Sequence, residues 1–122
     1  MRTFQTRAFQ RWAGKSGVTG AALLDAVAQM ERGLIDADLG GDLYKQRVAL
    51  PGRGKSGSTR TIIATQFAGV LFFLYGFEKN DRGNISAKEL ALYQRLARGL
   101  LDMTEVQIAT ALAGHILTEV TR

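Results

Sequence analysis

Cysteine is absent from this chain, and histidine and proline each occur once among its 122 residues. Without cysteine there is no disulfide and no thiolate chemistry, so a reducing cytoplasm is the expected location. A single histidine offers no His/Cys cluster, so we expect neither a metal site nor another cofactor. The sequence also lacks an apolar run of the roughly 18–20 residues that span a membrane, so no membrane partner is expected.

Positive charge is what the chain has in excess, and it is concentrated in one segment. The net charge is +5, and residues 45–60 carry five cations and no acid, so the rest of the chain sums to zero. These cations are Lys45, Arg47, Arg53, Lys55 and Arg60. Such a concentration favours phosphate and therefore nucleic acid, although a solvated surface remains the plainer alternative.

The length suits one domain, residues 1–122, with a single core. Apolar residues at 8, 9, 12 and 13 fall on one helical stripe, and Thr19 is expected to cap a second helix that ends at Gly33. Residues 3–6 fit either a short strand or a helix cap. Residues 36–42, rich in aspartate and glycine, are predicted to be a loop.

The middle of the chain changes from helical to strand periodicity. Residues 43–50, 59–67 and 70–77 are predicted to form a three-stranded antiparallel meander, with room for an extra edge strand. In the first of these strands Lys45 and Arg47 share one face, about 7 Å apart. Pro51-Gly52 suits the centre of a type II turn, and a flexible loop follows it.

Helices are expected again at the end of the chain. Ser86 and Glu89 are spaced as a capping box, and so are Thr104 and Gln107, whose helix is expected to stop at Gly114. The predicted fold class is therefore α+β, with a small antiparallel sheet packed by N-terminal and C-terminal helices.

Three short patterns resemble known sites, and each has a plainer explanation. Gly54-Lys55-Ser56 ends like a phosphate-binding P-loop, but Ala49 stands where that motif requires glycine. Residues 78–89 occupy several calcium-loop positions, but Arg82 would place a cation among the ligands, and a strand followed by a helix cap explains them. His115 follows a helix-ending glycine and is interpreted as structural.

The basic segment and its surroundings also resemble a known family. Residues 44–57 (YKQRVALPGRGKSG), 60–63 (RTII) and 72–80 (FFLYGFEKN) are similar to the core of RelE/HigB-type toxins of type II toxin–antitoxin systems. The closest likeness is to the subgroup with a glycine-rich K-S-G hairpin. The resemblance extends through residues 35–41 and 89–101, and it implies a RelE/ParE-like fold.

This resemblance implies a ribosome-associated mRNA endonuclease that a cognate antitoxin protein holds inactive. Lys45 and Arg47 match the basic pair on the strand that lines the RNA, and Arg60 matches the arginine at the scissile phosphate. Lys79 or Arg82 would match the basic residue after the last strand, and Lys79 is taken as the catalytic one. Ser86 stands near the place where relatives have a base-stacking aromatic residue. The expected RNA-binding residues are Arg53, Lys55, Tyr75, Phe77 and Arg82.

The residue types suit this chemistry without a metal. RNA supplies its own nucleophile, the 2′-hydroxyl, so the protein has to provide a base, assigned to Lys45, and a cationic clamp, assigned to Arg60. Two other functions stay open at this point. One is a non-catalytic basic protein that binds RNA or the ribosome, derived from such a toxin, and the other is a toxin of the same fold that acts on DNA gyrase.

Overall fold

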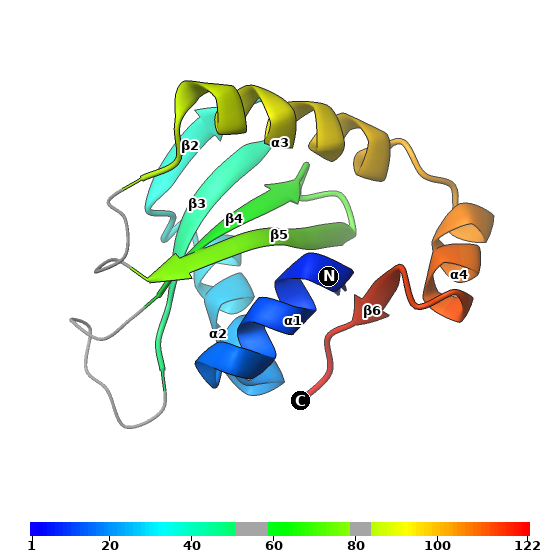
Figure 1. Ribbon diagram of the computed structural model, residues 1–122, viewed down its shortest axis with the longest axis horizontal. Coiled ribbons are helices and arrows are strands. Elements are labelled where there is room, and N and C mark those ends of the chain that lie inside the picture. The colour runs from blue at the N-terminus through cyan, green and yellow to red at the C-terminus, as the bar shows by residue number, and fades with distance from the viewer. Residues whose placement is uncertain (51–58, 79–83) are drawn as a thin grey trace.

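The computed structural model describes residues 1–50, 59–78 and 84–122, which form one sheet covered on both faces by helices (Figure 1). Within these residues the sheet has six strands in the order β2-β3-β4-β5-β1-β6. The elements along the chain are β1 (Arg2–Thr6), α1 (Arg7–Ser16), α2 (Gly20–Glu31), β2 (Ala37–Gly40), β3 (Leu43–Val48), β4 (Thr59–Thr65), β5 (Val70–Glu78), α3 (Ala87–Leu101), α4 (Glu105–Ala113) and β6 (Leu117–Glu119).

The predicted meander forms the centre of this sheet, and β3, β4 and β5 are antiparallel as expected. The predicted size of the sheet is wrong, because three further strands join it. The loop predicted over residues 36–42 is also wrong, since Ala37–Gly40 is strand β2, which pairs with β3. Its polar composition is tolerated because β2 is a short edge strand, and the turn signals belong to Gly40, Gly41 and Asp42, which adopt positive φ angles.

Strand β1 places the N-terminus in the interior of the sheet, parallel to β5 and antiparallel to β6. Residues 3–6 therefore form a strand, and the same segment provides the helix cap, because Thr6 Oγ1 accepts a hydrogen bond from the Phe9 amide at 3.2 Å. Strand β6 was not predicted. Arg2 on β1 donates two hydrogen bonds to Glu119 on β6, at 2.9 and 3.0 Å, and these bonds lower the pKa of Glu119.

The helix caps follow the sequence closely. Thr19 accepts a hydrogen bond from the Ala22 amide at the start of α2, and Gly17 ends α1 with a φ of 74°. Both predicted capping boxes are present, at Ser86 with Glu89 and at Thr104 with Gln107. These local rules satisfy amide groups at the helix starts that would otherwise lack partners.

Two apolar cores lie on opposite faces of the sheet. Helices α1 and α2 pack on one face, and α3 and α4 pack on the other (Figure 1). The first core is centred on the buried residues Phe9, Leu23, Met30, Ile63 and Phe73. The second core is centred on the buried residues Phe4, Leu43, Ile62, Phe72 and Leu117.

A bulge in β5 decides which of its residues faces which core. Ile62 pairs with Tyr75, but Ile63 pairs with Phe73, so Leu74 has no partner of its own on β4. One extra residue reverses the alternation of side chains along a strand. Tyr75 therefore faces the α3 side, instead of joining Phe73 beneath α1.

The same bulge turns Gly76 toward α1, where the indole ring of Trp12 lies against it. A Cβ atom at Gly76 would overlap three carbon atoms of that ring, so no larger residue fits unless the Trp12 side chain moves. The close approach of helix and strand at this point therefore requires glycine.

We expect Gly76→Ala to lower the free energy of unfolding by about 1–3 kcal/mol, because the added methyl group overpacks the contact with Trp12. Urea unfolding followed by far-UV circular dichroism measures the change. The matched control is Gly99→Ala in α3, where a Cβ atom meets nothing within 4 Å. That substitution should instead stabilise the protein by about 0.5–1 kcal/mol. Equal stability of Gly76→Ala and the native chain would contradict the packing argument.

Candidate nucleic-acid interface

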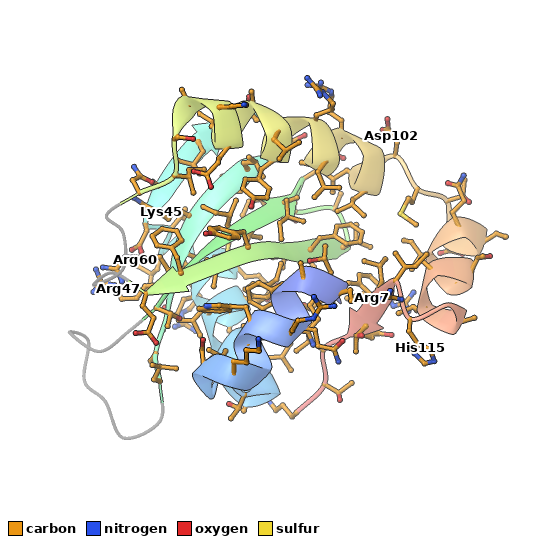
Figure 2. All side chains as sticks on the ribbon, viewed as in Figure 1. Arg7, Lys45, Arg47, Arg60, Asp102 and His115 are labelled. Carbon is orange, nitrogen blue, oxygen red and sulfur yellow. The ribbon has the colours of Figure 1, made fainter. Side chains whose placement is uncertain are left out.

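Three of the predicted cations meet on one face of the central meander. The strand register places Arg47, Arg60 and Phe77 in one row across β3, β4 and β5. The neighbouring row consists of Lys45, Ile62 and Tyr75. Figure 2 shows Lys45, Arg47 and Arg60 close together, near the end of β5. We call these two rows the cationic face.

The cationic face combines charge with an apolar floor. Ile62 is fully buried and Phe77 is 3% exposed, while the three cations are half-buried. Long basic side chains commonly lie with their stems on apolar surface and their charged ends in water. The floor therefore limits the directions in which the charged groups extend.

The electrostatics of this face favour an anion. Arg47 and Arg60 are directly opposite each other on neighbouring antiparallel strands, a placement in which Cβ atoms lie about 4.5–5.5 Å apart. Like charges in such a pair destabilise the sheet, and an anion between them relieves the repulsion. The site therefore has the charge arrangement of a phosphate-binding surface.

The Nε atom of Arg47 adds a second indication of an anion. This atom is buried and has no hydrogen-bond partner among the residues that the structure describes. A buried N–H group without an acceptor lowers the free energy of unfolding by about 1–3 kcal/mol, and such groups are rare in native proteins. Because the atom is covered, a phosphate oxygen can accept a hydrogen bond from it only if the Arg47 side chain turns outward when the ligand binds.

Aromatic rings border the cations on the α3 side. The rings of Tyr75 and Tyr93 stack, with centroids 5.4 Å apart and planes inclined by 27°. Tyr75 also contacts Phe77, at 5.9 Å between centroids. Tyr93 comes from α3 and was not among the predicted site residues. Its position on the apolar face of that helix indicated a core residue. Only its hydroxyl group could have indicated a surface site, because tyrosine is common where one end of a side chain is buried and the other contacts water.

Buried polar side chains support β3 from the opposite face of the sheet. Gln46, which is 2% exposed, donates a hydrogen bond to the Leu34 carbonyl at 2.9 Å and accepts one from the Asp36 amide at 3.1 Å. Thr61 Oγ1 donates to the Gln46 carbonyl at 2.8 Å. Gln46 lies between Lys45 and Arg47 in sequence, so these bonds hold the backbone that carries both cations.

Four of the predicted site residues lie outside the described residues: Arg53, Lys55, Lys79 and Arg82. The Pro51-Gly52 turn and the pattern resembling a P-loop lie there as well. The structure thus brings Lys45, Arg47, Arg60, Tyr75 and Phe77 together and does not test the other assignments.

The remaining patterns have structural explanations in the described part of the chain. Glu78 ends strand β5, and Ser86 and Glu89 form a capping box, which accounts for the ends of the segment resembling a calcium loop. His115 is exposed at the end of α4, where its carbonyl accepts a hydrogen bond from Arg7 at 3.2 Å. In Figure 2 it lies on the opposite side of the molecule from the three cations.

No group of three or more histidine, aspartate or glutamate side chains in residues 1–50, 59–78 and 84–122 is placed to hold a metal ion. None of the helices in these same ranges is both long and apolar enough to cross a membrane.

We expect Arg47→Met to raise the free energy of unfolding by about 1 kcal/mol at low salt, because it removes a like-charge pair and an unpartnered buried donor. Urea unfolding at low and high salt measures this gain, which should shrink as salt screens the repulsion. Arg95→Met, at an exposed position on α3, should leave stability unchanged. A less stable Arg47→Met protein would show that the arginine contributes to folding rather than opposing it.

The sequence as a whole also matches a known protein family. A family model described as "RelE toxin of RelE / RelB toxin-antitoxin system" matches residues 1–120. No curated protein matches the sequence.

Proposed function

Because the chain belongs to the RelE family of toxins from toxin–antitoxin systems, we propose that it is a HigB-type, metal-independent endoribonuclease that cleaves mRNA on the ribosome. The observation that carries the proposal is the opposed pair of Arg47 and Arg60 on an apolar floor, with the Arg47 Nε buried and lacking a partner among the described residues. This arrangement suits a bound phosphodiester group.

The proposed reaction uses the RNA's own 2′-hydroxyl as nucleophile. The 2′-oxygen attacks the adjacent phosphorus, and the bond from phosphorus to the 5′-oxygen of the next nucleotide breaks. The products are a 2′,3′-cyclic phosphate and a 5′-hydroxyl. Lys45 is the proposed base that accepts the proton of the 2′-hydroxyl, and a protonated group returns a proton to the leaving 5′-oxygen. Lys79 is the proposed acid, on the family resemblance alone.

Arg47 and Arg60 stabilise the charge that builds on the phosphate oxygens. A guanidinium group offers several N–H donors in one plane, which suits two oxygens of the same phosphate. Donors fixed before the reaction stabilise a transition state more effectively than donors that must reorganise. The hydrogen bonds of Gln46 and Thr61 hold the backbone of β3 from which Arg47 extends.

The aromatic rings beside the cations provide a surface for a base. Tyr75 and Tyr93 are half-buried, whereas Phe77 is buried and forms part of the floor. We therefore assign the base contact to the two tyrosines. Arg53, Lys55 and Arg82 are proposed as phosphate contacts that add affinity without taking part in the chemistry.

The proposed reaction requires the ribosome, because the cationic face contains no strong acid or base among its described residues. Lysine and arginine are weak proton-transfer groups at neutral pH, so cleavage depends on holding the 2′-hydroxyl in line with the leaving oxygen. Such ordering is worth several orders of magnitude in rate. An mRNA held in a codon-by-codon register by the ribosome would provide it.

Arg60→Ala should abolish growth inhibition while leaving the protein folded. Losing a guanidinium contact made in the transition state costs about 2–4 kcal/mol, or roughly 30- to 1000-fold in cleavage rate. Primer extension on cellular mRNA after expression should show codon-phased cuts for the native chain and none for the variant.

Arg98→Ala, which removes an exposed cation from α3, should retain full toxicity. Equal toxicity of Arg60→Ala at equal expression would rule out the assigned site. Growth inhibition by the native chain without any mRNA cuts would favour a non-catalytic protein that binds RNA or the ribosome.

Family membership implies a partner antitoxin, and we propose that it covers the cationic face with an acidic segment. Reversing two charges, with Lys45→Glu and Arg47→Glu together, should then weaken the complex and reduce its dependence on salt. Calorimetry with the protein encoded by the neighbouring reading frame measures both effects. An affinity that is unchanged at every salt concentration would place the antitoxin on another surface.

A further inference from the structure

The outer side of α1 carries a second group of cations. Arg7, Arg11 and Lys15 are spaced four residues apart, so they follow one another on a single face with one cation per helical turn of about 5.4 Å. With Gln10 and Gly14 they line a shallow, open depression of about 440 Å³. We call these five residues the α1 basic face.

The charges on the α1 basic face are not neutralised by the described part of the chain. Arg7 donates to the carbonyl oxygens of Gly114 and His115, which are uncharged acceptors. No ion pair to Arg11 or Lys15 occurs among the described residues. Helix α1 contains no acidic residue, so its outer surface is uniformly positive.

Three local rules of helix stability are broken on this one face. Cations four residues apart repel each other along a helix, and Arg7 opposes the helix dipole because it stands in the first turn. Gly14 lies in the helix interior, where alanine would be favoured. A Cβ atom at Gly14 would meet nothing within 4 Å, so packing does not require glycine there. Several departures from the rules of helix stability on one surface are typical of a functional site.

The α1 basic face is separate from the cationic face. Trp12 of α1 lies against Gly76, whereas the neighbouring Tyr75 faces the opposite side of the sheet. An RNA strand bound for cleavage between Arg47 and Arg60 therefore does not reach Arg11 or Lys15 at the same nucleotide.

We infer that the α1 basic face binds the phosphate backbone of a double-helical RNA segment. A row of cations on one helix face suits backbone recognition, and Gln10, the other polar side chain of this face, accepts a hydrogen bond from Thr118 at 3.0 Å through its Oε1 atom. Gly14 leaves open space between Arg11 and Lys15 for close approach of a phosphate. The choice of RNA rests on the proposed function, because the ribosome presents duplex RNA around the mRNA.

The test is binding of a short fluorescent RNA duplex by the full chain, measured by anisotropy over a range of salt concentrations. Replacing Arg11 and Lys15 together by alanine should weaken binding about tenfold and lower the slope of log affinity against log salt by about two. Alanine is a strong helix former, so circular dichroism should show α1 intact in this variant.

A matched control replaces the exposed pair Arg95 and Arg98 of α3 by alanine, which removes the same charge and should leave duplex binding unchanged. Equal loss in both double variants, or no loss in the α1 variant, would overturn the inference. Loss of antitoxin affinity in the α1 variant with normal duplex binding would overturn it too, because the face would then recognise protein.

The outcome is independent of the proposed cleavage reaction. Arg60→Ala should bind the duplex as tightly as the native chain, since Arg60 lies on the other face of the sheet. Duplex binding through α1 in a protein that cuts no mRNA would support this inference while refuting the proposed function. If the native chain makes codon-phased cuts but the α1 double variant still binds the duplex normally, the proposed function is supported and this inference is refuted.

Discussion

The bulge at Leu74 is the constraint on which the rest of this structure depends. It transfers Tyr75 from the α1 side of the sheet to the side of Arg60, and it turns Gly76 toward Trp12. Thr6 Oγ1, which caps α1, donates a hydrogen bond to the Leu74 carbonyl at 3.4 Å. The extra residue is therefore tied to the start of the helix that packs beside it, and the position of α1 and the composition of the cationic face are set together.

The cationic face places two cations opposite each other on neighbouring strands. Arg47 and Arg60 are register partners, and the buried Nε of Arg47 lacks an acceptor among the described residues. Hydrogen bonds of Gln46 and Thr61 on the opposite face hold the backbone of β3 in place. A sheet that is held by hydrogen bonds on one side and presents opposed cations on the other is suited to an anionic ligand.

Much of the fold follows from local chemistry and was predicted. Helix starts at Thr19, Ser86 and Thr104 obey side-chain capping rules that need no tertiary information. The central meander follows from alternation and turn residues. The two edge strands could not be predicted in this way, because β2 is polar enough to resemble a loop and β6 is three residues long. A short edge strand is defined by the neighbour it pairs with, and that neighbour is distant in sequence.

For the candidate site, the sequence by itself determined the supply of cations and the pairing of Lys45 with Arg47 on one face, since side chains in a strand alternate with a period of two. It also carried the family resemblance. Only the tertiary structure decided that Arg60 lies opposite Arg47, and that Tyr75 and Tyr93 border them. The reason is physical: strand register, a bulge and the packing of α3 arise from contacts between residues far apart in the chain, and no local pattern encodes them.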